Sequence, residues 1–567
     1  MIRQQIAQWV QQAIESARHA EGWSLETLPA FEVEIPRNAG FGDYATNAAM
    51  GLTRVLRLNP YTIAEQIRAH LPPQSNEWVE RVEIAGAGFL NFYLRAGWAG
   101  KVVHHILQQG ERFGETDVGS GRRVLIEFVS ANPTGPLSLG HGRNAAVGDT
   151  LARVLQANGY QVEREFYIND GENSTQIRNF ALSVLVRYRQ LLGEPAEMPE
   201  EGYFGDYVVA IARRIREQHG DRLVEGDPET VLRRFEQIAK QLMLEEQARD
   251  LHDFRVEFDR WFAEQSLYEQ GAVEATLQHL KEQGYAYEAD GALWLRSTAF
   301  GDEKDRVLVR ASGMPTYLAA DVAYHRDKFE RGYDLLIDLW GADHHGYVAR
   351  VKAAMSALGY DVSKLQILIY QLVNLYRGKE VVRMSKRAGD LITLREVMDE
   401  IGTDVLRFFY LLRSHESTLD IDLELAKAQS EENPVFYVQY AHARLCSIER
   451  TAEERGIACP DWAQTDLTML THPAEVALIK QLADLPHEVM LAGTQYAPHR
   501  LTAYALDTAR AFHSFYTECR VLGAETEALQ SARLWLVRAT RLVLAKTLQL
   551  LGVSAPERME GASCATP

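Results

Sequence analysis

The pattern of apolar and polar residues divides the chain into three regions. In residues 1–112 a helical repeat gives way to short strand-like runs at 31–36 and 78–94, which predicts a small N-terminal α+β domain. Residues 113–425 alternate apolar strands with helices, and residues 426–567 show helical repeats alone. We therefore predict an α/β central domain with a Rossmann-type parallel sheet, followed by a C-terminal all-α bundle.

The central domain begins with the apolar run VLIEFVS, a loop containing proline and glycine, and a helix that continues to Asn158. A second strand is expected at 161–170, and apolar runs at 334–340 and 365–372 extend the parallel sheet. Residues from about 173 to 300 are charged and helical in pattern, so we expect a helical insertion.

Composition and charge narrow the function classes. The chain has 567 residues and no apolar run of membrane-spanning length. Its amphipathic start is not a secretory signal, and its four scattered cysteines suit a reducing cytoplasm rather than a zinc ribbon. The net charge of −18 argues against non-specific binding of polyanions, but leaves room for a local basic groove.

The predicted helix after VLIEFVS starts at Gly140, His141 and Gly142. A helix start directs unpaired N–H groups and a positive dipole end at a docking anion, which favours a nucleotide phosphate. His141 could donate to a phosphate oxygen; the alternative is that it only caps the helix. Downstream, residues 377–397 carry Lys379, Arg383, Lys386 and Arg387 around Met384-Ser385. Such a segment could neutralise a leaving pyrophosphate, or be a solvated basic turn.

In combination these elements resemble a class I aminoacyl-tRNA synthetase. The segments EFVSANPTGPL, FYINDGENSTQI, WGADHHGYVARVKAAM and NPVFYVQYAHAR, with the N-terminal FGDYATNAAM, resemble the arginyl-tRNA synthetase family over nearly the whole chain. The resemblance implies an enzyme that activates L-arginine with ATP and Mg²⁺ and transfers it to the 3′ adenosine of tRNA(Arg). It also implies that tRNA is bound before activation. We expect a cytoplasmic monomer that does not bind membranes.

The resemblance assigns two catalytic residues, His141 and Lys386. The implied ATP-binding residues are Ser138, Gly140, His141, Gly142, Asp343, His344, Arg383, Met384, Ser385 and Lys386. Two of them depart from the family pattern, because Ser138 stands where histidine is usual and Arg383 where lysine is usual. Serine carries no charge, and arginine holds a phosphate through a planar fork, so both phosphate contacts stay open.

An arginine site needs carboxylates that meet the guanidinium in a bidentate way. By resemblance the arginine-binding residues are Glu127, Ser130, Asn132, Tyr317 and Asp321. Tyr317 precedes Asp321 by four residues, which places both on one face of a helix. The alternatives are an ordinary ion pair between Glu127 and Arg122 or Arg123, and a half-buried core position for Tyr317.

The implied tRNA contacts lie in the two terminal domains. They are Phe89 and Asn91 for the tRNA elbow, and Tyr437, Tyr440 and Arg444 for anticodon bases. Phe89 could equally be a core residue, as could one of the two tyrosines. His344 and His345 lack further ligands at metal spacing apart from Asp343, so no metal site is expected.

Two other classes of function remain open from the sequence. The altered Ser138 and Arg383 would suit a synthetase-like RNA-binding protein with weak catalysis. A related nucleotidyl-transfer enzyme, or a synthetase for another amino acid, is the second. The acidic residues Glu127 and Asp321 argue against an uncharged amino acid, and the helical C-terminal region argues against a small-molecule adenylyltransferase.

Overall fold

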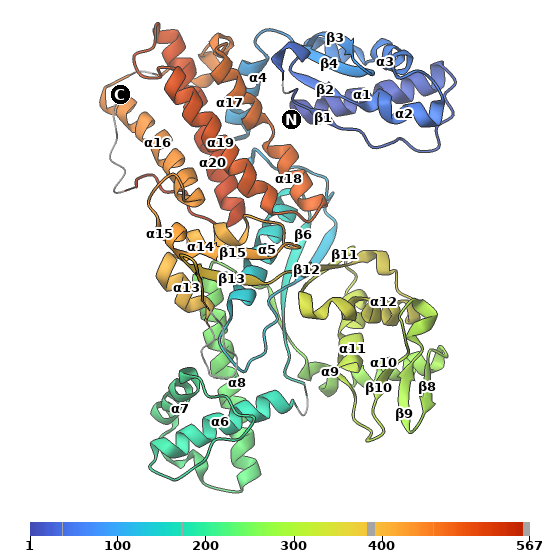
Figure 1. The fold of residues 1–567 in the computed structure, drawn as a ribbon, viewed down its shortest axis with the longest axis vertical. Helices are drawn as coiled ribbons and strands as arrows, with labels where there is room; N and C mark the ends of the chain where they lie inside the picture. Colours follow the sequence, from blue (N-terminus) through green and yellow to red (C-terminus); the bar gives the residue numbers. More distant parts are fainter. Residues whose placement is uncertain (37, 172–173, 383–391, 458, 560–567) are drawn as a thin grey trace.

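The computed structural model describes residues 1–36, 38–171, 174–382, 392–457 and 459–559. The N-terminal unit packs a helical layer against an antiparallel sheet of order β1-β2-β4-β3 (Figure 1). In α1, Ile2, Ile6, Val10 and Ala13 recur at helical spacing and are buried. The elements are α1 (Ile2–Ala20), β1 (Val33–Glu34), β2 (Tyr44–Thr46), α2 (Ala48–Leu56), α3 (Pro60–Ala69), β3 (Val79–Ala85), β4 (Phe89–Leu94) and α4 (Trp98–Gln109).

A parallel sheet forms the centre of the molecule and confirms the predicted Rossmann-type fold. Its order is β12-β11-β5-β6-β7, and all neighbouring strands run parallel. The strands are β5 (Arg123–Glu127), β6 (Gln161–Ile168), β7 (Arg260–Ala263), β11 (Leu335–Gly341) and β12 (Leu365–Tyr370). The chain continues from β5 to one side and returns to the other side with β11. The carboxyl ends of β5 and β11 therefore mark the topological switch point, where α/β proteins bind ligands.

Helix α5 (Leu139–Ala157) follows β5 and lies close against the sheet. A Cβ atom on Gly148 would come within 2.3 Å of the Phe128 ring, so only glycine allows this approach. The strand, loop and helix that were predicted from the apolar pattern are all present, with β5 ending at Glu127 rather than at Ser130.

The helical insertion is confirmed for α6 (Thr175–Leu191), α7 (Asp206–His219) and α8 (Pro228–Asp253), which share their own apolar core. The rest of the range that was expected to be helical contains short strands as well as helices. Residues 260–263 form β7 of the main sheet, where Trp261 stacks on Phe166 at 4.3 Å. The elements that follow are α9 (Gln265–Glu269), α10 (Ala272–Glu282) and an antiparallel sheet of β8 (Ala286–Ala289), β9 (Ala292–Leu295) and β10 (Arg306–Val309). Strands of four residues carry too little alternation to stand out from flanking helices.

The remaining elements complete the site region and the C-terminal bundle. Around the sheet lie α11 (Tyr317–Glu330), α12 (Val348–Ala357), β13 (Val373–Arg377), β14 (Glu380–Val381), α13 (Leu394–Ile401), α14 (Thr403–Tyr410), β15 (Leu419–Asp422) and α15 (Leu423–Lys427). The predicted bundle is present as α16 (Pro434–Glu454), α17 (Pro473–Ala483), α18 (Leu485–Thr494), α19 (His499–Glu518) and α20 (Glu527–Leu551). Figure 1 shows the bundle between the N-terminal unit and the central sheet.

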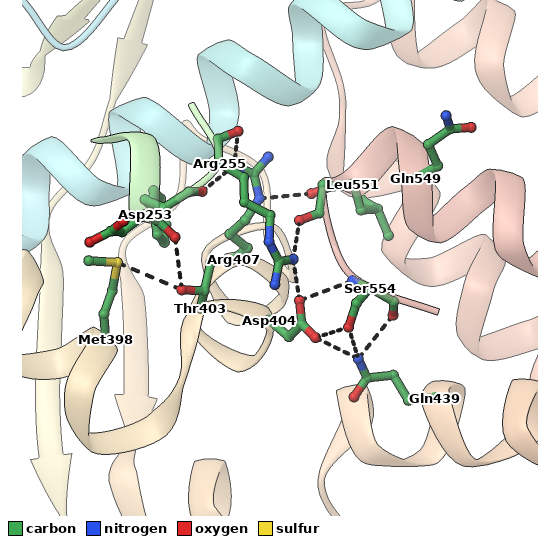
Figure 2. A network of polar contacts seen from close by, with 12 residues as sticks. Asp253, Arg255, Met398, Thr403, Asp404, Arg407, Gln439, Gln549, Leu551 and Ser554 are labelled. Atoms are coloured by element: carbon green, nitrogen blue, oxygen red, sulfur yellow. Dashed lines mark hydrogen bonds and ion pairs between the residues drawn. The ribbon is translucent and has the colours of Figure 1, made fainter. Parts of the chain in front are cut away.

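Hydrogen bonds from two charged residues of α14 attach this bundle to the central domain (Figure 2). Arg407 of α14 is fully buried and donates to Asp149 of α5 at 2.6 Å and to the carbonyl oxygen of Leu551 at 3.1 Å. Asp404, on the same helix, accepts from Gln439 of α16 at 2.9 Å and from the backbone N–H of Ser554 at 3.0 Å. The end of α20 is thereby fixed to the helix that contacts α5.

Candidate active site

Most of the candidate site residues collect at the carboxyl edge of the central sheet. Glu127 ends β5, the loop with Ser130 and Asn132 follows it, and Asp343 and His344 follow β11. Helix α11, which carries Tyr317 and Asp321, packs on the same region. Strand order alone brings together residues that are some 200 positions apart in the chain.

The start of α5 is closed by a reciprocal cap between Ser138 and His141. The backbone N–H of Ser138 donates to His141 Nδ1 at 3.1 Å, and the His141 N–H donates to Ser138 Oγ at 3.4 Å. His141 therefore does cap the helix. Because Nδ1 accepts a backbone N–H, the neutral ring carries its proton on Nε2, in a form suited to donation to a phosphate oxygen.

The glycines beside His141 differ in their surroundings. A Cβ on Gly142 would lie 2.7 Å from Leu394 and 2.8 Å from the Tyr410 hydroxyl, so this glycine allows α5 to contact α13 and α14. A Cβ on Gly140 would meet nothing closer than Ser138 Oγ at 3.7 Å. Gly140 is therefore the position where the backbone lies open to a ligand.

The predicted Arg383-Met384-Ser385-Lys386 segment lies outside the described residues, but the chain that follows it is placed beside the α5 start. Thr393 forms a β-bridge with Ser138, and the N–H of Leu394 donates to the carbonyl oxygen of Leu137 at 2.7 Å.

The loop after β5 has a strained backbone that other elements support. Val129 and Ser130 have φ angles of 67° and 43°, in the left-handed region that non-glycine residues rarely adopt. The Val129 N–H donates to Asn144 Oδ1 at 2.9 Å. Gln247 of α8 donates to the carbonyl oxygens of Asn132 and Gly135 at 3.0 and 2.8 Å, so the insertion supports the loop. The Asn132 side chain is exposed.

Helix α11 begins at Tyr317 and places Asp321 one turn later, as the spacing predicted. Tyr317 is 62% exposed and is therefore not a core residue. The Asp321 side chain is half-buried, and burial raises the pKa of its carboxyl, although His325 and Tyr347 oppose the rise. An exposed phenol one turn from a carboxylate suits a cationic ligand.

Glu127 is buried, and both of its carboxylate oxygens have partners. Ser130 Oγ donates to one oxygen at 2.8 Å, and the Lys328 ammonium donates to the other. The ion-pair partner is thus Lys328, rather than the neighbouring Arg122 or Arg123.

Glu264 is an acidic residue of this edge that was not among the predicted site residues. It directly follows β7, is 5% exposed, and lies so close to Gly171 that a Cβ there would come within 2.3 Å of Glu264 Oε1. Burial raises the pKa of Glu264 to about 7; the Tyr167 hydroxyl opposes the rise, and Asp321 and Asp170 add to it. No sequence signal marked Glu264, because β7, the strand that it follows, has only four residues and was not predicted.

Asp343 and His344 are both exposed, with the His344 Nε2 and Asp343 Oδ2 atoms 3.6 Å apart. Within the described part of the chain, no group of three or more His, Cys, Asp or Glu side chains could hold a metal ion. No helix in that part is long and apolar enough to cross a membrane.

The candidate tRNA-binding residues lie on β4 and α16, which Figure 1 shows in the two terminal domains. In β4, Phe89 is half-buried and Asn91 is only 3% exposed. In α16, Tyr437 packs against the bundle core, whereas the Tyr440 hydroxyl accepts from Arg444 at 2.8 Å. Tyr437 is therefore the tyrosine with a core role.

Comparisons with known proteins agree along the whole chain. Residues 2–94 match the arginyl tRNA synthetase N terminal domain, residues 102–191 and 198–409 match the catalytic domain of tRNA synthetases class I (R), and residues 438–559 match the DALR anticodon binding domain.

Individual relatives match at similar coverage. The chain is 51% identical to the arginine–tRNA ligase of Heliobacterium modesticaldum, over 98% of this chain and 99% of that protein. It is 46% identical to the Bacillus subtilis arginine–tRNA ligase, over 98% and 100%. The solved arginyl-tRNA synthetase of Thermus thermophilus has the same fold, with a TM-score of 0.76 and 24% identity, over 99% of this chain and 100% of that chain. The chain belongs to the arginyl-tRNA synthetase family of class I aminoacyl-tRNA synthetases.

Proposed function

We propose that the enzyme activates L-arginine with ATP and transfers the arginyl group to the 3′ adenosine of tRNA(Arg). One observation carries the proposal: acidic residues and a capped helix start meet at one edge of the parallel sheet. Asp321, Glu264 and Glu127 provide negative charge, and the start of α5 provides backbone N–H groups a short way along the same edge.

The acidic group suits the guanidinium of arginine. A guanidinium presents planar donors that pair with carboxylates in a bidentate way, whereas an uncharged side chain would bring no counter-charge to Asp321 and Glu264. Asp321 lies close enough to Glu264 to raise the pKa of that carboxyl, so a cation between them relieves a repulsion. Tyr317 covers the site from α11, and Ser130 and Asn132 are proposed for the α-amino and carboxylate groups.

The activation step then needs only positioning and charge stabilisation. A carboxylate oxygen of arginine attacks the α-phosphorus of ATP, the bond to the bridging oxygen of the β-phosphate breaks, and pyrophosphate leaves with the electron pair. His141 Nε2 and the backbone around Gly140 are proposed to stabilise the α-phosphate charge, with Ser138, Gly142, Asp343 and His344 around the nucleotide. Mg²⁺ enters with ATP as part of the substrate. Lys386, aided by Arg383, Met384 and Ser385, is proposed to neutralise the pyrophosphate.

In the second step the terminal ribose hydroxyl of tRNA attacks the arginyl carbonyl carbon, and AMP leaves. Phe89 is proposed to contact the tRNA elbow, and Tyr440 and Arg444 the anticodon bases. Asn91 stays a prediction, although its side chain is buried. A requirement for bound tRNA in the first step, a monomeric state and a cytoplasmic location also belong to the proposal.

Two measurements test this function. Charging of tRNA(Arg) with a panel of amino acids should give product with arginine alone. ATP–pyrophosphate exchange should require both arginine and tRNA(Arg). Binding of tRNA without any exchange would instead identify a synthetase-like RNA-binding protein, and charging with another amino acid would contradict the arginine assignment.

A further inference from the structure

A continuous hydrogen-bonded chain runs beneath the proposed arginine site. The backbone N–H of Tyr167 donates to Ser130 Oγ at 3.1 Å, and Ser130 Oγ donates to Glu127 at 2.8 Å. Lys328 then bridges Glu127 and Asp338, donating to Asp338 Oδ1 at 2.8 Å. The chain therefore joins the strained loop after β5 to the neighbouring strand β11.

The chain continues to helix α11 through His325. His325 Nε2 lies 2.8 Å from Asp338 Oδ2, and His325 Nδ1 lies 2.8 Å from the carbonyl oxygen of Asp321. A carbonyl oxygen only accepts, so Nδ1 carries a proton, and an ionised Asp338 requires a second proton on Nε2. The ring is thus positively charged whenever Asp338 is ionised.

Sheet register explains how these charges come together. Asp338 of β11 and Glu127 of β5 are paired neighbours in the parallel ladder, and both side chains face α11. Two carboxylates side by side in the interior repel each other unless a cation lies between them. The Lys328 ammonium occupies that position and also lies 4.3 Å from the Tyr324 ring centroid.

All four charged side chains are removed from solvent. Lys328 is 0% exposed, Asp338 1%, His325 3% and Glu127 6%. Buried charges are tolerated only when they are paired and hydrogen-bonded, and here two acids meet two bases. The group as a whole is neutral, so Glu127 can accept hydrogen bonds from the substrate while Asp321 and Glu264 provide the uncompensated negative charge.

The titration behaviour agrees with this geometry. Burial would raise the pKa of Asp338, but Lys328 and His325 outweigh it and lower the pKa to about 2. For Glu127, burial raises the pKa above the usual range; Lys328 is the largest opposing influence, and Asp338 adds to the rise. The Lys328 ammonium is therefore the largest influence that favours the ionised form of both carboxylates.

We propose that Lys328 is a positioning residue for arginine binding. It keeps Glu127 ionised and oriented, and through Ser130 and His325 it holds the loop after β5 in a fixed position relative to Asp321. Each carboxylate oxygen of Glu127 has one protein donor and retains a lone pair for a guanidinium N–H. The inference rests on the proposed function, because it assumes that arginine binds at this edge.

The charged and titratable groups around Glu127 decide what removal of Lys328 does. They are Glu165 and Tyr167 on β6, Asp338 on β11, and Tyr324, His325 and Lys328 on α11. The Ser130 hydroxyl on the loop is a further, neutral hydrogen-bond donor. Glu165 has its own partners, since Arg331 donates to both of its oxygens at 2.6 and 2.9 Å. Without Lys328, the repulsion from Asp338 is opposed by His325 and by the hydrogen bond from Ser130, and Glu127 holds a proton to higher pH.

The test is calorimetric titration of L-arginine into the full-length native enzyme and the Lys328→Met, Lys328→Arg and Lys281→Met variants over mildly acidic to mildly alkaline pH. Lys281 forms an exposed ion pair with Glu288, so Lys281→Met controls for loss of a lysine elsewhere. We expect Lys328→Met to weaken arginine binding about tenfold or more at neutral pH, and to regain affinity as pH rises and Glu127 ionises. Lys328→Arg should restore most of the affinity.

The outcomes separate the two levels of the proposal. A native enzyme that does not bind arginine contradicts the proposed function and the inference together. A native enzyme that binds arginine, with a Lys328→Met variant of equal affinity and equal pH profile, overturns the inference alone. If Lys328→Met does not fold, His325→Gln is measured instead. Glutamine keeps a neutral donor and removes one charge, so a smaller shift in the same direction is expected, and an unchanged profile overturns the inference.

Discussion

Ser138 and His141 cap the start of helix α5 reciprocally, with the Ser138 N–H 3.1 Å from His141 Nδ1. This relationship gives Ser138 a structural reason to stand where the family usually has histidine. A serine at the N-cap accepts from the backbone three residues on, which few side chains do as well. The same contact fixes the tautomer of His141 that is suited to donate to a phosphate.

We predict that Ser138→Ala lowers both stability and activity. Loss of an N-cap acceptor costs about 1 kcal/mol of unfolding free energy. The variant also loses the contact between Ser138 Oγ and His141 Nδ1, which are 3.1 Å apart, so the His141 ring is held less firmly and kcat in ATP–pyrophosphate exchange should fall. Thr526→Ala is the matched control, because Thr526 caps α20 through the N–H of Leu529 at 3.2 Å, in the C-terminal bundle. Urea unfolding should show similar losses for both variants, and exchange should fall only for Ser138→Ala. Equal kcat in the two variants would contradict a role for the cap in catalysis.

The pH dependence of arginine binding should report on Glu264. Its pKa is raised to about 7, mainly by burial, so its ionised fraction increases as pH rises through that value. Arginine keeps its positive charge throughout, and the arginine KM should therefore fall as pH rises through about 7.

Glu264→Gln should remove this pH dependence and raise the arginine KM about tenfold, as expected for loss of a hydrogen bond to a charged group. Glu246→Gln is the control, because burial also raises the pKa of Glu246, which lies on α8 of the insertion. Steady-state exchange measured across pH gives both parameters. A Glu264→Gln enzyme that keeps the native inflection would show that another group titrates.

Local sequence pattern was enough to predict the parts of the site that depend on neighbours in the chain. The helix start at Gly140–Gly142 and the one-turn spacing of Tyr317 and Asp321 follow from helical periodicity and turn residues, and both are present. The assignment of substrate to these residues came from family resemblance, since spacing alone allows a core tyrosine or a capping histidine.

The hydrogen-bonded chain beneath the proposed arginine site could not be predicted in this way. Lys328 of α11 meets Glu127 across 201 positions, and it bridges Glu127 and Asp338 because β5 and β11 are neighbours in the sheet. Ion pairs between distant segments depend on strand order, which periodicity does not give. A partial signal exists: VLIEFV and LLIDLW each hold one acidic residue within an apolar strand, and a buried acid requires a partner.

The two tyrosines of α16 should behave differently when they are truncated. Tyr437 packs against the core, so Tyr437→Ala should lower the unfolding free energy by about 2 kcal/mol or more. The Tyr440 hydroxyl accepts a hydrogen bond from Arg444. We expect Tyr440→Ala to leave stability nearly unchanged and to weaken tRNA binding, with a loss of about 1–3 kcal/mol of binding free energy for a stacked base. Thermal unfolding and filter binding of tRNA(Arg) at fixed salt measure the two effects. Native tRNA affinity in Tyr440→Ala would remove this tyrosine from the proposed interface.

The junction between the bundle and the central domain should be sensitive to a single methyl group at Gly552. This glycine ends α20 with φ 68°, and a Cβ there would lie 2.2 Å from Arg407 Nη2, within the buried contacts of Figure 2. Gly552→Ala therefore combines backbone strain of about 1 kcal/mol with a clash against Arg407, whose buried side chain cannot move without losing its ion pair with Asp149.

Gly456→Ala is the matched control, because Gly456 has φ 63° and nothing within 4 Å of its Cβ position. Urea unfolding should show a loss for Gly552→Ala that exceeds the loss for Gly456→Ala by about 1–3 kcal/mol. Equal losses would mean that Arg407 adjusts freely, and that its buried contacts do not fix the end of α20.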